Sequence, residues 1–266
     1  MRMFGFRDLH TVGVLGASSI RERLTGLAQL GIEVTPEVIL QMPAKDRPKE
    51  LRSARERGHI VVDPPYTEAE LVELVGDTSV DLEMGGKLRI HSNPHEHPVR
   101  RGEYLETPVV DLTVPETVEQ IAETDTLYEL DNRAYVLTPG AFVKTITLRC
   151  YFMPYDLLGW VTGRSSVGRW GITTTVDAPG IDPGFSGPIV LEIAHIGTWP
   201  FALRKGLAIA QMRFLNVEGK MATPYDERHE TWRRQSDVQY AVAPQSPLFH
   251  PWPEVIGRGV NPPEEE

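Results

Sequence analysis

The chain of 266 residues contains one cysteine, Cys150, so disulfide bonds within the chain cannot hold it together. Because Cys150 stands in an apolar, strand-like context, we expect it to be an ordinary core residue of a reduced, intracellular protein. The sequence also lacks an apolar run long enough to span a bilayer, and it lacks an N-terminal signal peptide. These absences predict a cytoplasmic protein without a membrane partner.

Basic residues are scarcer than acidic ones, with 27 Lys and Arg against 37 Asp and Glu and a formal net charge of −10. Binding nucleic acid irrespective of sequence requires a basic surface that neutralises phosphates, so this charge argues against nucleic acid as a partner. A small anionic ligand held by a few local arginines is compatible with it. The content of 41% hydrophobic and 24% charged residues is typical of a globular protein with a sizeable core.

Glycine and proline are plentiful, with 23 and 22 residues, and they separate many short apolar runs. This pattern favours an all-β barrel or sandwich over an α/β fold. Gly85 and Gly86 lie between two such runs and indicate a hairpin with a tight glycine turn. The expected strands are residues 60–62, 79–82, 87–90, 135–137, 142–148, 157–161, 171–176, 188–194 and 208–214.

Helices are expected only near the N-terminus, in a short turn after Arg164 and in the C-terminal tail. Alternating charges at helical spacing predict an exposed helix over 49–58 that ends at a Gly58 cap, and residues 19–30 are a second helix candidate. We divide the chain into an N-terminal extension of unknown role (1–48), a β-barrel domain (49–222) and a tail with an acidic, disordered end (223–266).

One stretch, residues 163–192, gathers turn-forming residues, hydroxyl and guanidinium groups, and acids. An apolar run ends there at Gly-Arg-Ser-Ser, so we expect a strand to give way to a short helix that the serines cap. The start of such a helix is a natural site for an anion. Ser165 and Arg169 are four positions apart, which puts a hydroxyl and a guanidinium on one face of the turn. A nucleotide phosphate would suit both groups.

The acids of this stretch are Asp177, Asp182 and Glu192. Glu192 ends an apolar run, and an ionised carboxylate buried in such a strand is costly unless it has partners or a raised pKa. Two interpretations stay open: a general base, and an ion pair with Arg164 or Arg169. Asp182 lies in Ile-Asp-Pro-Gly, where a carboxylate often satisfies only backbone donors.

A histidine-rich segment has the composition of a metal site but lacks the regular spacing of a zinc motif. Its candidate ligands are His91, His95, Glu96 and His97. An exposed polar loop and a metal site are both compatible with this segment.

The sequence resembles the dCTP deaminase family of the trimeric dUTPase superfamily in the order and spacing of four motifs. They are Gly-Arg-Ser-Ser-Val-Gly-Arg (163–169), Ile-Asp-Pro-Gly-Phe-Ser-Gly (181–187), Ile-Val-Leu-Glu (189–192) and Pro-Phe-Ala-Leu-Arg-Lys-Gly-Leu-Ala-Ile-Ala-Gln (200–211). Weaker matches lie at 76–82 and 135–140. The resemblance implies a mainly all-β, distorted, jelly-roll-like barrel of the dUTPase type with a few short helices. It also implies a homotrimer with active sites between subunits, which converts dCTP and water to dUTP and ammonia.

The resemblance further implies roles for individual residues. Glu192 would take a proton from the water that attacks C4 of cytosine and pass it toward the leaving amine. Ser165 and Arg169 would hold the water network and stabilise that glutamate and the intermediate. The implied substrate contacts are Arg164 and Ser166 with the phosphates, the Ala178 carbonyl with the water, Asp182 and Phe185 with the sugar, and Tyr225 and Gln235 in a tail that closes over the nucleotide.

The resemblance implies Mg²⁺ bound with the triphosphate and no metal on the base or on protein side chains. The residues argue independently against zinc, because zinc deaminases need His-x-Glu and Pro-Cys-x-x-Cys motifs. The chain has neither motif and only one cysteine.

The chain departs from the family just before the Ile-Asp-Pro-Gly turn. Members that only deaminate usually have Thr-Ala-His there, and members that also cleave dUTP usually have Thr-Ala-Gly, whereas this chain has Asp177, Ala178 and Pro179. Asp177 adds a carboxylate beside the expected base pocket, where we expect it to contact the base or the water. Four alternatives stay open: a bifunctional dCTP deaminase and dUTP diphosphatase, a deaminase of a modified dCTP, a plain dUTPase, and a non-catalytic nucleotide-binding regulator.

Overall fold

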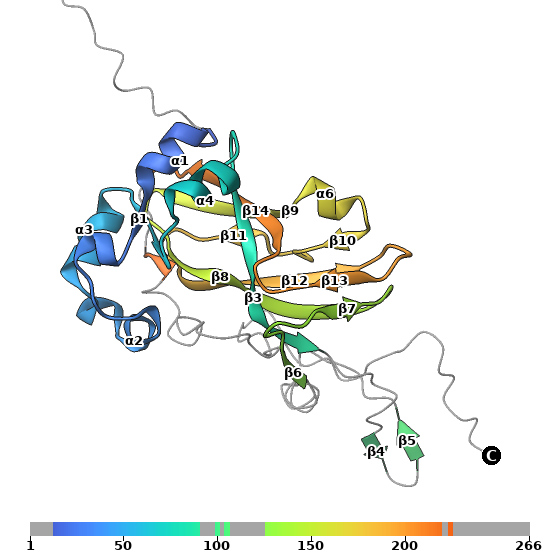
Figure 1. Cartoon of the computed structure of the whole chain (residues 1–266). Helices are drawn as coiled ribbons and strands as arrows, with labels where there is room; N and C mark the ends of the chain where they lie inside the picture. Colours follow the sequence, from blue (N-terminus) through green and yellow to red (C-terminus); the bar gives the residue numbers. More distant parts are fainter. Residues whose placement is uncertain (1–12, 91–98, 102–103, 107–125, 220–222, 226–266) are drawn as a thin grey trace, which may run out of the picture. The chain divides into compact units, whose positions relative to one another are not determined.

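The computed structural model describes residues 13–90, 99–101, 104–106, 126–219 and 223–225 (Figure 1). The chain divides into two compact units, and the first comprises residues 1–90 and 127–239. In the second unit, β4 (Val99–Arg101) pairs antiparallel with β5 (Tyr104–Glu106). The candidate site residues that the structure describes all lie in the first unit.

One sheet of ten strands forms the body of the described chain. Its path runs β1-β2-β8-β3-β14-β9-β11, with β12 also paired to β8, β10 to β12 and β6 to β3. The strands are β1 (Leu24–Gly26), β2 (Ile60–Asp63), β3 (Val80–Ile90), β6 (Thr126–Glu129), β8 (Phe142–Phe152), β9 (Leu157–Gly163), β10 (Ile172–Thr173), β11 (Gly180–Ile181), β12 (Ser186–His195) and β14 (Ala208–Asn216). A separate antiparallel pair joins β7 (Tyr135–Leu137) to β13 (Phe201–Leu203).

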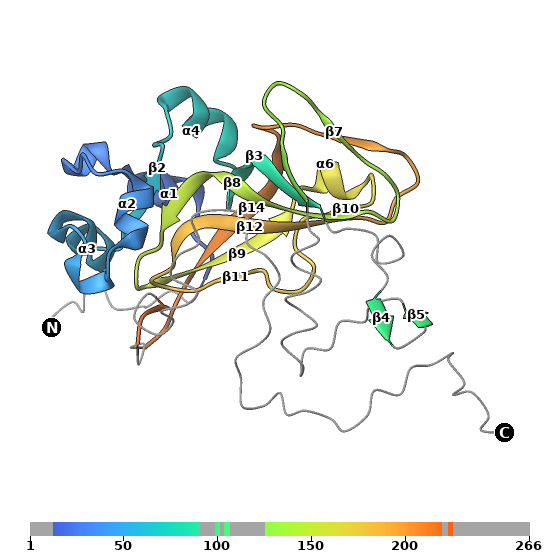
Figure 2. The same ribbon diagram turned by 90° about the horizontal axis from the view of Figure 1, so that it is seen from below.

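The long strands of this sheet share one apolar core. Leu82 of β3, Tyr151 of β8, Val161 of β9, Leu191 of β12 and Phe214 of β14 are all buried in it. Figure 2 shows β8, β12, β9 and β11 wrapping past one another rather than lying in a flat sheet. Leu24 of β1 and Ile181 of β11, at the two ends of the path, also pack against this core, so the sheet is strongly curled. The prediction of a mainly β fold with a few short helices is confirmed.

Short helices accompany the sheet, and none in the described part of the chain is long and apolar enough to cross a membrane. They are α1 (Ala17–Arg23), α2 (Pro36–Gln41), α3 (Lys49–Glu56), α4 (Glu68–Leu74), α6 (Ser165–Gly168) and the 3₁₀ turns Ala28–Leu30 and Ala44–Asp46. The helix predicted over 49–58 is confirmed by α3. Gly58 follows it with a φ of 83°, the left-handed conformation that glycine adopts without a steric penalty.

The expectation that no helix lies between α3 and Arg164 is wrong, because α4 does. Its start is a capping box: the Thr67 hydroxyl accepts a hydrogen bond from the Glu70 N–H at 3.3 Å, and the Glu70 carboxylate accepts one from the Thr67 N–H at 2.8 Å. This exchange satisfies two donors that a helix start otherwise leaves unpaired. The Thr-x-x-Glu spacing was present in the sequence and signals the helix.

The hairpin predicted at Gly85 and Gly86 is also wrong, because both glycines lie inside the continuous strand β3. The register of β3 against β8 shifts between Met84 and Leu88. A Cβ atom on Gly85 would lie 2.9 Å from the carbonyl oxygen of Ile146. Glycine is therefore needed here for a close approach between two strands, not for a turn.

The helix predicted at 19–30 is only partly right, because its first residues lie in α1 and the chain then extends the sheet. α1 ends at Arg23, and β1 then pairs parallel with β2. A second apolar cluster joins this segment to α3 and β8, and Ile39, Leu51 and Cys150 belong to it. Cys150 is 8% exposed, which confirms its prediction as a core residue. The domain boundary at residue 48 stays a prediction.

Candidate functional site

The turn after β9 carries the hydroxyl of Ser165 and the guanidinium of Arg169, which the sequence predicted to lie together. α6 begins after Arg164, whose extended backbone is the N-cap, and no side chain caps the helix. The prediction that the serines cap it is therefore wrong, and both Ser165 and Ser166 are exposed. The Arg169 N–H donates to the Ser165 carbonyl at 3.2 Å, which closes the single turn. Ser165 and Arg169 thus share one exposed helical turn, as their spacing predicts.

Arg164 is tied to the sheet below α6. Its Nη2 lies 3.1 Å from Oδ2 of Asp81 on β3, and its Nη1 donates to the Ala208 carbonyl of β14 at 3.1 Å. Burial raises the pKa of Asp81, and the positive charge of Arg164 opposes that rise. Of the two ion pairs left open for Glu192, the one with Arg164 is replaced by a pair between Arg164 and Asp81, a residue to which the sequence assigned no role. Its motif, residues 76–82, was the only signal.

Glu192 does not lie among the apolar residues that precede it. Along β12 the side chains alternate, so that Leu191 and Ile193 are fully buried in the core while Glu192 is half-buried on the opposite face. Its Oε2 accepts a hydrogen bond from the Val176 N–H at 3.4 Å, and its own N–H donates to the Thr174 carbonyl at 3.1 Å. The expectation of a carboxylate buried in an apolar strand is corrected: Glu192 is open to a ligand.

The segment beside Glu192 carries the residues that depart from the family pattern. The strand predicted over 171–176 is reduced to β10, and the chain beyond it is irregular as far as β11. Asp177 and Ala178 are exposed in this segment, directly after the residue that contacts the Glu192 carboxylate. The Pro179 carbonyl accepts a hydrogen bond from the Val161 N–H at 2.8 Å, which anchors the segment to β9. The hydrogen bond from Val176 therefore brings the segment that holds Asp177 and Ala178 beside Glu192.

A second group of predicted residues gathers at the start of β12, in the turn formed by residues 182–186. It is here named the sugar turn, because the resemblance implies that Asp182 and Phe185 contact the sugar. The Phe185 N–H donates to the Asp182 carbonyl at 3.0 Å and closes the turn. The Tyr225 N–H donates to the Pro183 carbonyl at 3.2 Å, and the Phe185 and Tyr225 ring centroids are 5.7 Å apart. Tyr225 is thus adjacent to the sugar turn. Phe185 is only 4% exposed and serves as part of the core in the single chain.

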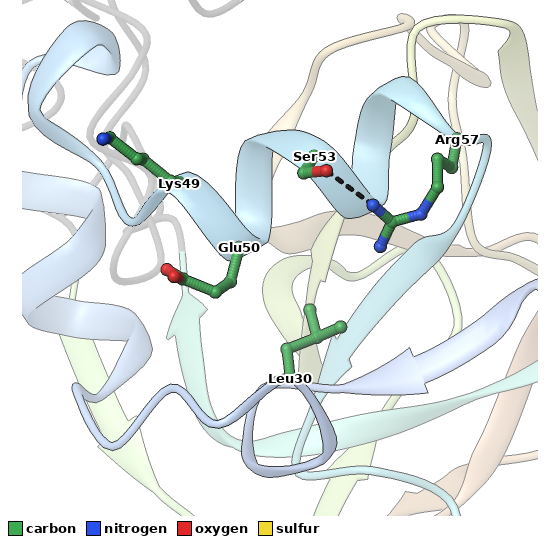
Figure 3. Close-up of a pocket in the computed structure, with 5 residues that line it drawn as sticks. All are labelled: Leu30, Lys49, Glu50, Ser53 and Arg57. Atoms are coloured by element: carbon green, nitrogen blue, oxygen red, sulfur yellow. Dashed lines mark hydrogen bonds between the residues drawn. The ribbon is translucent and has the colours of Figure 1, made fainter.

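Some predicted residues are not placed with these groups. Gln235 and the metal candidates His91, His95, Glu96 and His97 lie outside the described residues. In the described part of the chain, no three side chains of His, Cys, Asp or Glu gather in a way that could hold a metal ion. A hollow on α3, lined by Leu30, Lys49, Glu50, Ser53 and Arg57, contains none of the predicted site residues (Figure 3).

Comparisons with known proteins identify the family of this arrangement. A sequence model of the family described as dCTP deaminase-like matches residues 47–217. Curated relatives named dCTP deaminase, from Shewanella sp. (strain ANA-3) and Shewanella frigidimarina (strain NCIMB 400), are 34% and 32% identical over 199 and 198 residues. These alignments cover 73% of this chain and 94% and 93% of the relatives.

Solved structures show weaker similarity. A 2′-deoxycytidine 5′-triphosphate deaminase from Agrobacterium tumefaciens matches with a TM-score of 0.47 at 20% identity, over 78% of this chain and 49% of that chain. The dUTPase of EIAV matches with a TM-score of 0.30 at 26% identity, over 36% of this chain and 78% of that chain. The family assignment rests on the sequence matches, which cover most of the described sheet. By those matches, the chain belongs to the dCTP deaminase-like family.

Proposed function

We propose that the chain is a dCTP deaminase, which hydrolyses the 4-amino group of the cytosine in dCTP and releases dUTP and ammonia. The observation that carries this proposal is the position of Glu192, a half-buried carboxylate on the open face of β12 beside the segment that holds Ala178. The curated relatives, which align over 73% of the chain and are named dCTP deaminase, support the same reaction.

Glu192 would act as the base and proton carrier. As water adds to C4 of cytosine, its proton passes through Glu192 to N3 of the ring. The proton of the new hydroxyl then passes to the amino group, the bond between C4 and the amino nitrogen breaks, and ammonia leaves while C4 becomes a carbonyl. The hydrogen bond from the Val176 N–H to Oε2 orients the carboxylate for these transfers. Ala178, two residues after Val176, would offer its carbonyl to the water.

The exposed turn of α6 would bind the phosphates of the substrate and the reaction intermediate. Ser165 and Arg169 would hold the water network and stabilise the intermediate, while Arg164 and Ser166 would contact phosphates. Arg164 keeps 38% of its side chain exposed although it pairs with Asp81, so part of the guanidinium can still reach an anion. Exposure of these groups in the single chain suits a site that a neighbouring subunit completes, and we propose a homotrimer.

Mg²⁺ would accompany the triphosphate and neutralise part of its charge. Deamination itself is assigned only to groups of the chain and to water.

Asp177 supports an alternative specificity, because its exposed carboxylate follows the residue that contacts Glu192. If Asp177 contacts the base or the water, replacing it by threonine should shift the ratio of kcat/KM between dCTP and dUTP, or between dCTP and a 5-substituted dCTP, by about tenfold, or about 1.4 kcal/mol. Steady-state kinetics with the three nucleotides measure this ratio. Unchanged ratios in an Asp177→Thr variant that folds and assembles would limit Asp177 to a structural role.

Product analysis tests the proposed function. The full chain is incubated with Mg²⁺ and either dCTP or dUTP, and ammonia and the nucleotides are measured. A dCTP deaminase converts dCTP to dUTP and leaves dUTP unchanged. Formation of dUMP from dCTP identifies a bifunctional enzyme, cleavage of dUTP alone identifies a dUTPase, and binding without any product identifies a regulator; the last two results reject the proposal.

A further inference from the structure

We infer that Arg47 and Arg55, which flank and belong to α3, are positioning residues that hold the sugar turn and thereby set the preference for deoxyribose over ribose. This inference rests on the proposed function, in which Asp182 and Phe185 contact the sugar. It requires no contact between α3 and the nucleotide.

Arg47 reaches the sugar turn directly. Its side chain is buried, with the residue 4% exposed, and Nη1 donates to the Ser186 hydroxyl at 2.9 Å across 139 residues of sequence. Ser186 is itself buried and follows Phe185 in the chain. A buried hydrogen bond from a guanidinium is stronger and more directional than one between neutral groups. The position of Ser186 is therefore coupled to that of Arg47.

Arg55 supports the same turn from a second direction. Its Nε donates to the Met153 carbonyl at 2.8 Å, and its guanidinium carbon lies 4.7 Å from the centre of the Tyr155 ring. The Met153 N–H in turn donates to the Phe185 carbonyl at 2.8 Å. The Phe185 carbonyl, just before β12, is thus linked through Met153 to Arg55 of α3.

The two arginines and Tyr225 act on different parts of the turn. Tyr225 contacts Pro183 and the Phe185 ring. Arg47 contacts Ser186, and Arg55 acts on the Phe185 backbone only through Met153. Phe185 is therefore fixed from both directions. Since packed side chains cannot shift freely, a small displacement of Phe185 changes the space next to a sugar at this turn.

The remaining residues of α3 provide a matched control. Arg57 follows the helix and is exposed, and its Nη1 donates to the Ser53 hydroxyl at 2.5 Å on the outer surface (Figure 3). Arg57 and Arg47 thus carry the same group at either end of α3, one outside and one inside. Replacing each by methionine removes the charge and the donors but keeps an unbranched apolar side chain.

The test compares the ratio of kcat/KM for dCTP to that for CTP in wild type, Arg47→Met, Ser186→Ala and Arg57→Met. We expect the ratio to fall by about tenfold or more in the first two variants and to stay unchanged in Arg57→Met. A purely structural role would lower the thermal stability of Arg47→Met and leave the ratio alone, and that result overturns the inference. Because Ser186→Ala deletes one atom, it provides an answer even if Arg47→Met fails to fold.

Two further measurements complete the test. The double variant Arg47→Met with Ser186→Ala should change the ratio no more than the larger single effect, since both remove one interaction; additive effects overturn the coupling. Calorimetric binding of dCTP and CTP gives the same ratio without turnover. If the wild type prefers dCTP to CTP in binding but releases no ammonia, the proposed function is rejected. The ratio of dCTP to CTP binding in the variants then decides this inference. Equal binding of both nucleotides by the wild type overturns it.

Discussion

Replacing Glu192 by glutamine should abolish the release of ammonia from dCTP while leaving nucleotide binding nearly intact. The amide keeps the shape of the side chain and can still contact the Val176 N–H through its oxygen, but it cannot accept the proton of water. Loss of a general base costs about 10²–10⁴-fold in rate, and we expect kcat for dCTP to fall at least about 10³-fold. Coupled ammonia detection and calorimetric titration with dCTP measure the two quantities.

Controls separate the role of Glu192 from a general effect of charge. Glu218→Gln, at an exposed position after β14, removes the same charge and should keep wild-type activity. Glu192→Asp keeps a carboxylate but withdraws it by one methylene, so an intermediate rate is expected. Substantial turnover by Glu192→Gln would remove Glu192 from the role of base, and a loss of dCTP binding equal to the loss of rate would assign it to binding instead.

Replacing Arg149 by methionine should have the largest effect on stability. Arg149 lies on β8 with its side chain 4% exposed, and it forms ion pairs with Glu70 of α4 and Glu83 of β3. Its guanidinium also covers the Tyr66 ring, 4.2 Å from the ring centre. Removing one partner of a buried charge cluster leaves the others uncompensated, which typically costs 3–5 kcal/mol. We expect the free energy of unfolding to fall by about 3 kcal/mol and the melting temperature by roughly 6–12 °C.

The pH dependence provides a check on this prediction. The Thr67 backbone N–H and Arg149 hold the pKa of Glu70 below its ordinary value, so the stabilisation from Glu70 is present above the unfolded pKa and is lost as pH falls through the folded pKa. The stability difference between wild type and Arg149→Met should therefore shrink in acid. Arg149→Lys keeps one charge but cannot reach both carboxylates equally, and it should be intermediate. An unchanged unfolding midpoint in Arg149→Met would mean that the cluster contributes no net stability.

β12 illustrates how far the sequence could predict the site. Its apolar run indicated a strand, and the structure has one, but a run of apolar residues does not reveal which face of the strand is covered. Alternation along β12 buries Leu191 and Ile193 and turns Glu192 outward. The error concerned the surroundings of Glu192 and not its position, so the role proposed for it does not depend on a buried carboxylate.

The sequence alone could not predict which side chains of distant segments would pair. Arg164 pairs with Asp81, and Arg47 with Ser186, because strands and helices far apart in the chain become neighbours in the fold. Local spacing predicts only contacts within one element, such as the shared turn of Ser165 and Arg169. The hairpin predicted at Gly85 was wrong for a related reason, since a glycine pair is compatible both with a turn and with a close approach of strands.

Incubation of dCTP with the full chain in water enriched in heavy oxygen tests the account most directly. The account predicts that ammonia is released and that the product dUTP carries one heavy oxygen, located in the uracil base at C4, because water is the nucleophile. Mass spectrometry of the intact nucleotide and of the freed base locates the label. Recovery of unchanged dCTP, or label found in phosphate with none in the base, would contradict it.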